Sequence, residues 1–305
     1  MPSISILVIT YNRAYDLLCF LESLATQQDV ERYVAETLIL NNASTDSYED
    51  VKEFIALHPA IKAEFIDHNE NLGVARGRNY LIKKAKSPYL LVLDDDVLLE
   101  KTDAIATTAT LFSKPQFVEN NTAVITLNIY YWDTKERQES ALPHKRYEEY
   151  KDKEWFLTSY FIGAAHLMRS ELFQKTGYYP ENFFYGMEEY DLSYRVLDAG
   201  YTLAYDSSVL VWHKESPLGR QPNHKKVQMQ WVNKSIVAWR YLPLRYFFTT
   251  AFMWNLQFLK LVPKHVGTYF ASWIKIFSIP FREKRKPIGN DALHYLKKVK
   301  ARLWY

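Results

Sequence analysis

Residues 89–96 read Tyr-Leu-Leu-Val-Leu-Asp-Asp-Asp, and this stretch decides the fold. Five apolar or aromatic residues in a row are typical of a strand that is buried on both faces of a parallel sheet. Ligands of such sheets bind outside the carboxyl ends of the strands, and Mg²⁺ and Mn²⁺ take carboxylate and phosphate oxygens together. The stretch therefore predicts a divalent metal at Asp94–Asp96. The alternative is a helix start with acidic residues in its first turn.

Strands and helices alternate on both sides of this stretch. Apolar runs predict strands over residues 4–10, 36–40, 63–66, 89–93, 123–127, 202–205 and 209–212. Helical spacing predicts helices over residues 13–28, 51–57, 74–85, 103–112 and 188–199. This order predicts an α/β fold with a doubly wound, Rossmann-like and mostly parallel sheet. Residues 133–153 are highly charged without a clear period, and we expect a mobile surface loop over the site.

The charge of the chain is divided unevenly between its two parts. Residues 1–212 hold 20 basic and 32 acidic residues, a balance of −12, whereas residues 213–305 hold 18 and 3, a balance of +15. The second part also carries 17 of the 48 aromatic residues. We therefore predict two regions, a sheet domain over residues 1–215 and a basic, aromatic, helical region over residues 216–305.

The composition of the C-terminal region favours a membrane surface as its partner. Its longest uncharged run, residues 246–259, has 14 residues and falls short of the roughly 20 that a spanning helix needs. Tryptophan, lysine and arginine together favour the headgroup level of an anionic bilayer. The alternative is a helical cap on the sheet domain. Nucleic acid is disfavoured, because no recognisable nucleic-acid motif is present.

Two further features bear on the compartment. The single cysteine, Cys19, excludes an internal disulfide and indicates a reducing environment. The N-terminus starts almost at once with a strand, without the pattern of a secretory signal. We expect a cytoplasmic protein that lies peripherally at the inner face of the cell membrane.

Several short motifs occur in a fixed order, each at a predicted strand end or loop. They are Thr10-Tyr11-Asn12, Asn41-Asn-Ala-Ser-Thr-Asp46, Asn71-Leu-Gly-Val-Ala-Arg-Gly-Arg-Asn79, Asp94-Asp95-Asp96, Phe183-Phe-Tyr-Gly-Met-Glu-Glu-Tyr-Asp-Leu192 and His213. Together they closely resemble the family 2 inverting glycosyltransferases with the GT-A fold, especially the bacterial rhamnosyltransferase-like branch. The resemblance covers residues 3 to about 215.

The resemblance implies roles for the matching positions. The nucleotide would be bound by Thr10, Tyr11, Asn12, Asn41, Asn42, Asp46, Arg78, Asp94 and Asp95. The metal, Mn²⁺ or Mg²⁺, would be held by Asp96 as a direct ligand, with Asp94 and His213. The catalytic carboxylates would lie among Glu188, Glu189 and Asp191, with Glu189 as the general base. An alternative is that these three acidic residues only favour a helix N-terminus.

Two positions depart from the family pattern. Asn41 stands where most relatives have an aspartate that accepts a hydrogen bond from a uracil ring, so the identity of the base is open. Glu188-Glu189 stands where relatives usually have Glu-Asp, which moves the second carboxylate about one methylene further out.

The resemblance implies a metal-dependent inverting glycosyltransferase. The donor would be a dTDP- or UDP-linked sugar, rhamnose or another hexose. The acceptor would be a hydroxyl of a glycan or of a polyprenyl-diphosphate-linked glycan in cell-surface polysaccharide biosynthesis. The rivals are a sugar nucleotidyltransferase, which would carry a Gly-rich basic loop where Thr10-Tyr-Asn-Arg13 stands, and a catalytically decayed relative that binds nucleotides or glycans at the membrane.

Overall fold

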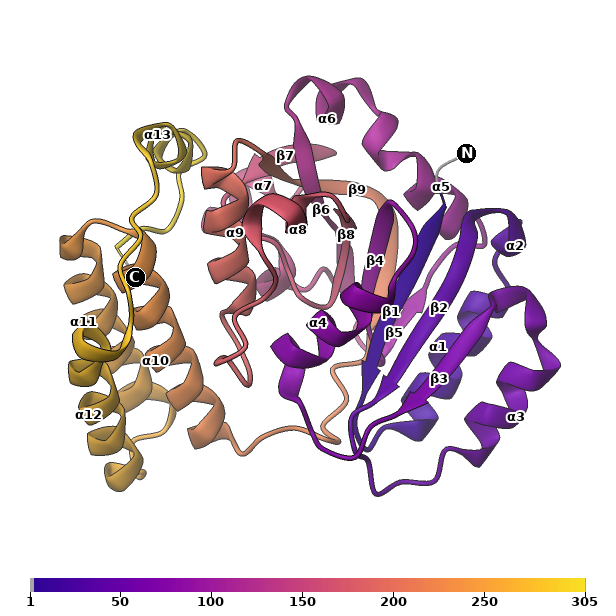
Figure 1. The fold of residues 1–305 in the computed structure, drawn as a ribbon, viewed down its shortest axis with the longest axis horizontal. Coiled ribbons are helices and arrows are strands. Elements are labelled where there is room, and N and C mark those ends of the chain that lie inside the picture. The colour runs from indigo at the N-terminus through magenta and orange to yellow at the C-terminus, as the bar shows by residue number, and fades with distance from the viewer. Residues whose placement is uncertain (1–2, 305) are drawn as a thin grey trace.

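A mixed β-sheet forms the centre of the molecule in the computed structural model, which describes residues 3–304 (Figure 1). Its first four strands by position are β3, β2, β1 and β4, and all three pairs between them are parallel. Their bounds are Ile4–Thr10 for β1, Val34–Asn41 for β2, Ala63–Asp67 for β3 and Tyr89–Asp94 for β4. This half of the sheet confirms the parallel α/β arrangement that the alternation of strands and helices predicts.

Beyond β4 the sheet is mixed. Strand β8 runs antiparallel to β4, β6 runs antiparallel to β8, and β9 runs parallel to β6. Two short strands, β5 and β7, pair with β9 in the antiparallel direction. The bounds are Val97–Leu99 for β5, Thr122–Tyr131 for β6, Trp155–Thr158 for β7, Ala165–Arg169 for β8 and Thr202–His213 for β9. The directions combine so that β9 points the same way as β4.

Strand β9 is one continuous strand, where the sequence predicts two short ones. Asp206, one of the polar residues that interrupt the apolar pattern, is held by a hydrogen bond within the strand and by an ion pair from a distant part of the chain. Asp206 accepts a hydrogen bond from the Ser208 backbone N–H at 2.9 Å and binds Lys114 Nζ at 2.8 Å. Pairing with β6 therefore continues on both sides of these residues, with a shift in register between Thr126 and Asn128.

Helices cover both faces of the sheet. They are α1 Ala14–Ala25, α2 Val30–Tyr33, α3 Glu49–Leu57, α4 Gly73–Lys84, α5 Ala104–Thr110, α6 Pro115–Glu119, α7 Tyr147–Tyr150, α8 Leu172–Thr176 and α9 Glu188–Asp198. Along β1, Ile6 and Val8 belong to the hydrophobic core that includes α1, whereas Leu7 belongs to the core that includes α4 and α9. Because successive strand residues point to opposite faces, this alternation buries the sheet on both sides.

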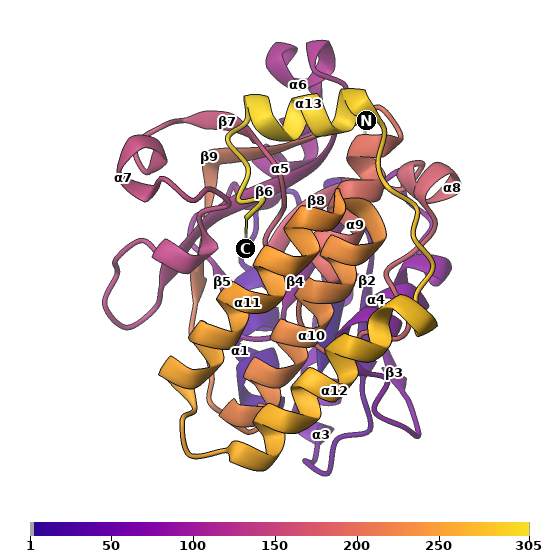
Figure 2. The same ribbon diagram turned by 90° about the vertical axis from the view of Figure 1, so that its left-hand side faces the viewer.

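The C-terminal region is helical, as the sequence predicts, and up to residue 304 the structure describes four helices in it. They are α10 Asn223–Tyr241, α11 Leu244–Leu261, α12 Val266–Arg282 and α13 Asn290–Lys298. Helix α10 packs on α9, and α11 and α12 pack on α10 as an outer layer remote from the sheet (Figures 1 and 2). The fully buried Trp231 of α10 joins this layer to the core, and its indole N–H donates to the Ala251 carbonyl at 3.0 Å.

Residues 133–153, for which the sequence predicts a mobile surface loop over the site, pack against the body of the molecule, and Gln138 of this segment contacts His213. The segment contains a 3₁₀ turn over Glu139–Ala141 and helix α7, and Ala141 and Leu142 are buried. Glu149 binds Lys300 Nζ at 2.8 Å. The apolar residues between the charges, together with this ion pair, account for the packing.

Asp191 joins helix α9 to the C-terminal region. Its Oδ1 accepts hydrogen bonds from Arg195 at 2.6 and 2.9 Å, and its Oδ2 accepts from Arg240 at 2.7 Å and from the Tyr241 hydroxyl at 3.0 Å. The side chain borders neither of the cavities described below. With both oxygens occupied, we assign it to the packing of α9 on α10 and not to the catalytic set.

Replacing Asp191 with Ala is expected to lower the free energy of unfolding by about 3 kcal/mol, because two mostly buried guanidinium groups lose their shared partner. Urea denaturation followed by circular dichroism measures the change. Asp152→Ala, at an exposed position, is the control and should leave the free energy of unfolding within about 0.5 kcal/mol of wild type. A loss for Asp191→Ala no larger than that of the control would contradict the assignment.

Candidate active site

The register of the sheet brings the predicted motifs to one edge. Thr10 pairs with Asn41, and Ile9 pairs with Asp94, so the carboxyl ends of β1, β2 and β4 lie level. Because β9 points the same way as β4, its last residue, His213, reaches the same edge, where it pairs with Val97. The polar residues that follow separate strands in the sequence therefore meet in space.

A cluster of possible metal ligands lies at this edge. One ligand atom each from Asp94, Asp96 and His213 can be chosen so that all lie within 4.8 Å of one another. Asp96 Oδ1 is buried without a hydrogen-bond donor and lies 3.2 Å from His213 Nε2. A carboxylate pair with one imidazole nitrogen suits Mn²⁺, and also Mg²⁺.

Gln138 fixes which nitrogen of His213 faces the cluster. Its amide nitrogen lies 3.0 Å from Glu215 Oε1, so its carbonyl oxygen is the atom that accepts from His213 Nδ1 at 2.9 Å. In the neutral imidazole Nε2 carries a lone pair directed at Asp96, and these two acceptors, 3.2 Å apart, need a proton or a cation between them. Burial lowers the pKa of His213, but contact with Asp96 raises it above its ordinary value overall. The residues therefore fit a divalent cation.

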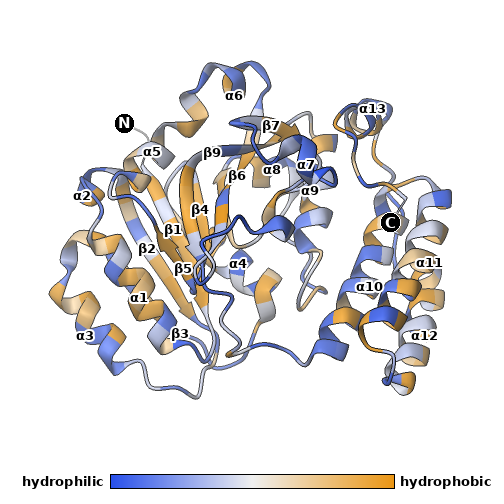
Figure 3. Ribbon diagram, turned by 180° about the vertical axis from the view of Figure 1, so that it is seen from behind, coloured by the Kyte–Doolittle hydropathy of each residue, from blue (hydrophilic) through white to orange (hydrophobic). Residues whose placement is uncertain are grey.

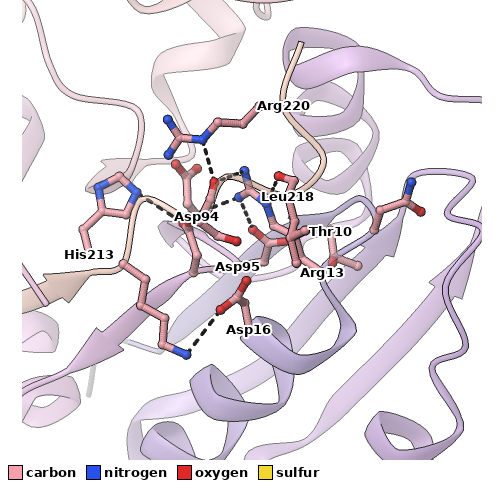
Figure 4. A network of polar contacts seen from close by, with 12 residues as sticks. Thr10, Arg13, Asp16, Asp94, Asp95, His213, Leu218 and Arg220 are labelled. Atoms are coloured by element: carbon pink, nitrogen blue, oxygen red, sulfur yellow. Dashed lines mark hydrogen bonds and ion pairs between the residues drawn. The ribbon is translucent and has the colours of Figure 1, made fainter. Parts of the chain in front are cut away.

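Arg13 neutralises the other side of the cluster (Figure 4). Its Nη1 lies 2.9 Å from Asp95 Oδ1 and 3.2 Å from Asp96 Oδ2. Burial nevertheless raises the pKa of Asp95 to about 7, against the opposing effect of Arg13. Burial also tends to raise the pKa of Asp96, but His213 and Arg13 lower it below its ordinary value. The Asp95 carboxyl is thus partly protonated near neutral pH, whereas Asp96 is ionised.

The segment after β9 closes over the same carboxylates. The Ser216 N–H donates to Asp96 Oδ2 at 2.9 Å, and Arg13 Nε donates to the Leu218 carbonyl at 2.7 Å. Arg220 binds the Ser216 carbonyl at 2.6 Å, as Figure 4 shows. The link between the sheet and the C-terminal helices is therefore part of the site.

One cavity opens beside the cluster. From the predicted nucleotide-binding set it is lined by Tyr11, Asn42, Arg78, Asp94 and Asp95, together with Asp96 and His213 of the metal set. Polar side chains to which the sequence analysis assigns no binding role also line it, namely Arg13, Asn71, Glu215, Arg220, Gln221 and Lys226. Arginine and lysine facing three carboxylates across a cavity form a site for a metal-bound, negatively charged ligand.

Four predicted nucleotide-binding residues lie outside the wall of this cavity. Thr10 is buried, and its hydroxyl lies 2.8 Å from the Tyr48 hydroxyl. Asn12 and Asn41 brace the loop after β2. Asn12 accepts from the Thr45 N–H at 2.7 Å, and Asn41 donates to Asp67 at 2.8 Å and accepts from the Ser44 N–H at 3.0 Å. Asp46 is exposed on the same loop.

A second cavity holds the predicted carboxylates of α9. Its lining includes Glu188 and Glu189, the aromatic residues Tyr160, Tyr185 and Tyr190, and Gly163. Arg78 and Asp94 line both cavities. Arg78 Nη1 lies 2.8 Å from Glu189 Oε1, and Nη2 lies 3.0 Å from the Gly163 carbonyl and 3.6 Å from Asp94 Oδ1. Arg78 thus connects the acidic cluster to the carboxylates of α9.

The two glutamates have different surroundings. Glu188 is buried with one unpaired oxygen, and burial together with the charge of Glu189 raises its pKa to about 8. Glu189 is more exposed, with 16% of its side chain accessible against 3% for Glu188. A side chain at Gly163 would collide with Glu189 Oε1 and Arg78, so only glycine permits this approach. The surroundings of Glu188 therefore favour its protonated form.

The mixed sheet, the acidic cluster at its edge and the helices that follow define a GT-A-like α/β fold. Residues 5–177 match the model of the family described as glycosyl transferase family 2, and the chain belongs to this family. It is 31% identical over 180 residues to an uncharacterized protein of Haemophilus influenzae, which covers 58% of this chain and 92% of that protein. It is 29% identical over 154 residues to the teichoic acid poly(glycerol phosphate) polymerase of Staphylococcus epidermidis, which covers 50% of this chain and 20% of the polymerase.

Solved structures share the fold at low sequence identity. The mannosyltransferase PcManGT from Pyrobaculum calidifontis, in complex with GDP-Man and Mn²⁺, has a TM-score of 0.60 at 16% identity, over 97% of this chain and 79% of that one. S. aureus TarS 1–349 in complex with UDP-GlcNAc has a TM-score of 0.64 at 14% identity, over 91% of this chain and 81% of that one. These likenesses concern the fold alone.

Replacing Gln138 with Leu is expected to weaken Mn²⁺ binding about tenfold, because the hydrogen bond that orients His213 is lost. Isothermal titration calorimetry with Mn²⁺ alone measures the affinity. Gln28→Leu, at an exposed position far along the chain, is the control. Equal affinities for the two variants would show that Gln138 does not orient a metal ligand.

Proposed function

We propose that the protein is a metal-dependent inverting glycosyltransferase that uses a nucleoside-diphosphate sugar. The observation that carries the proposal is the position of the Asp94–Asp96–His213 cluster. It lies in the cavity that is lined by Tyr11 and Asn42, and Arg78 links it to the second cavity, where Glu189 lies. A donor in the first cavity and an acceptor in the second would meet beside Arg78.

Asp96, Asp94 and His213 are the residues that would hold the metal ion. A bound Mn²⁺ or Mg²⁺ would neutralise charge on the diphosphate that leaves. Arg13, Arg220 and Lys226 would add positive charge around the same group. Tyr11 and Asn42 would border the nucleoside, and Asn42 is held for this by the Leu72 N–H, which donates to its Oδ1 at 2.8 Å.

Glu189 is the proposed general base. Its Oε1 lies 2.8 Å from Arg78 Nη1, its side chain is more exposed than that of Glu188, and it lines the second cavity. It would take the proton of an acceptor hydroxyl as that oxygen bonds to the anomeric carbon from the face opposite the diphosphate. The bond from the anomeric carbon to the diphosphate oxygen breaks in the same displacement, which inverts the anomeric centre without a covalent enzyme intermediate.

The donor that we favour is dTDP- or UDP-linked, as in the rhamnosyltransferase-like branch, with rhamnose or another hexose as the sugar. Asn41 is engaged by Asp67 and Ser44 in this structure, so its amide shapes the loop beside the nucleoside. The structural neighbours bind GDP-Man and UDP-GlcNAc. A panel of bases is therefore the appropriate test.

The proposed acceptor is a hydroxyl of a glycan or of a polyprenyl-diphosphate-linked glycan in cell-surface polysaccharide biosynthesis. Tyr160, Tyr185 and Tyr190 line the second cavity and give it an aromatic border beside which a sugar ring could lie. The relative named as a teichoic acid poly(glycerol phosphate) polymerase agrees with a cell-surface product.

Donor use tests the proposal most simply. With Mn²⁺, the wild type is expected to bind and slowly hydrolyse one donor from a panel of dTDP-, UDP- and GDP-sugars. Loss of the metal ligand in Asp96→Ala should reduce hydrolysis at least 100-fold, as should EDTA with the wild type. No donor bound under any condition would overturn the enzyme assignment, and metal-dependent binding without turnover would favour a binding module.

Replacing Glu189 with Gln is expected to lower kcat by about 10²- to 10⁴-fold while donor affinity is kept, because only proton transfer is lost. Initial rates with the donor identified above, and calorimetry with the same donor, separate the two effects. Glu188→Gln keeps the shape of the same helix start and should lose far less activity. A larger loss in Glu188→Gln than in Glu189→Gln would reassign the base.

A further inference from the structure

Two outer helices carry continuous stripes of exposed apolar side chains. On α11 the stripe consists of Leu244, Phe248, Phe252, Leu256 and Leu259, and on α12 it consists of Val266, Phe270, Ile274, Phe277 and Phe281. The spacing of three or four residues places each set on one helix face. Exposure is large, reaching 71% for Ile274 and 90% for Phe281. We call these ten residues the outer apolar face.

The outer apolar face points away from the rest of the molecule. The buried residues of the same helices, such as Phe247, Phe258 and Ile276, belong to the core shared with α10. Figures 2 and 3 show α11 and α12 on the outside, with hydrophobic positions along both helices. Exposed apolar side chains that run along two outer helices mark an interaction site.

The charge around this face indicates the kind of partner. Residues 244–282 contain the five basic residues Arg245, Lys260, Lys264, Lys275 and Arg282 and no acidic residue. All five are exposed. A second copy that docked the same face symmetrically would set these positive charges against themselves, which is unfavourable. An anionic surface with an apolar interior satisfies both the phenylalanines and the cations.

The helices are built to lie on such a surface. In the part of the chain that the structure describes, we find no helix whose length and apolar content would let it cross a bilayer. Helices α11 and α12 have 18 and 17 residues, with apolar residues on one face and polar or packed residues on the others. This is the pattern of interfacial helices, whose apolar face enters the headgroup and acyl boundary.

We propose that the outer apolar face docks on an anionic lipid bilayer. Helix α10 would then lie between the bilayer and the site, because it packs on both outer helices and also contributes Lys226 and Gln230 to the two cavities. If the proposed transferase function holds, this arrangement keeps the second cavity close to lipid-linked acceptors. The docking itself does not depend on that function, since it rests on α11 and α12 alone.

Vesicle sedimentation tests the docking without any sugar. The full chain is expected to sediment with vesicles of phosphatidylglycerol and phosphatidylcholine, more weakly with phosphatidylcholine alone, and less as salt is raised. Phe270→Ser combined with Phe277→Ser is expected to lower the partition coefficient about tenfold or more, since two of the largest inserted side chains are lost.

The matched control is Leu57→Ser combined with Val118→Ser, which removes two equally exposed apolar side chains from α3 and α6. Circular dichroism and thermal unfolding should show both double variants folded. Three results would overturn the proposal. The first is that the wild type does not sediment with the vesicles, and the second is that the two double variants sediment equally. The third is a lipid-free dimer in analytical ultracentrifugation that only Phe270→Ser/Phe277→Ser disrupts, because the face would then be an interface between copies.

Discussion

Three adjacent carboxylates at the end of a buried strand are the constraint on which the rest of the site depends. Burial makes ionised carboxylates costly, so opposing charge must be present before any ligand arrives. Arg13, from the turn after β1, supplies it on one side, and His213, at the end of β9, supplies it on the other side when its imidazole is protonated. The segment after β9 adds the Ser216 N–H. The cluster therefore requires that β1 and β9 end at the same edge of the sheet as β4.

Ion pairs of the same kind connect the site to the helices behind it. Arg78 lies between Asp94 and Glu189 and contacts both, so the two cavities share one side chain in their walls. In the same first turn of α9, Asp191 is held by Arg240 of α10, and Arg240 also binds Glu283 at 2.6 Å. Helix α9, which carries Glu189, is therefore fixed to the C-terminal region by ion pairs that are mostly buried.

The sequence pattern predicts the site residues that directly follow the ends of strands. The positions of Asp94, Asp96 and His213 follow from apolar runs that stop at polar residues, and the α/β order follows from alternation. Arg13 lies 82 residues from Asp95 in the chain, and Gln138 lies within a charged stretch without a period, so neither contact has a local signal. Thr10 and Asp46 lie within the motifs that resemble the family, but Thr10 is buried against Tyr48 and Asp46 is exposed, so neither lines the first cavity. Neighbouring residues of a strand point to opposite faces, so a motif at a strand end does not show which of its side chains enters the cavity. The direction of a side chain on an exposed loop is not fixed by the sequence pattern either.

Anomalous diffraction from crystals grown with Mn²⁺ and a nucleoside diphosphate tests the central claim most directly. The account predicts one strong manganese peak within coordination distance of Asp96 and His213, with the diphosphate between that ion and the basic wall formed by Arg13, Arg220 and Lys226. A nucleoside diphosphate bound elsewhere, or a manganese peak away from these side chains, would contradict it.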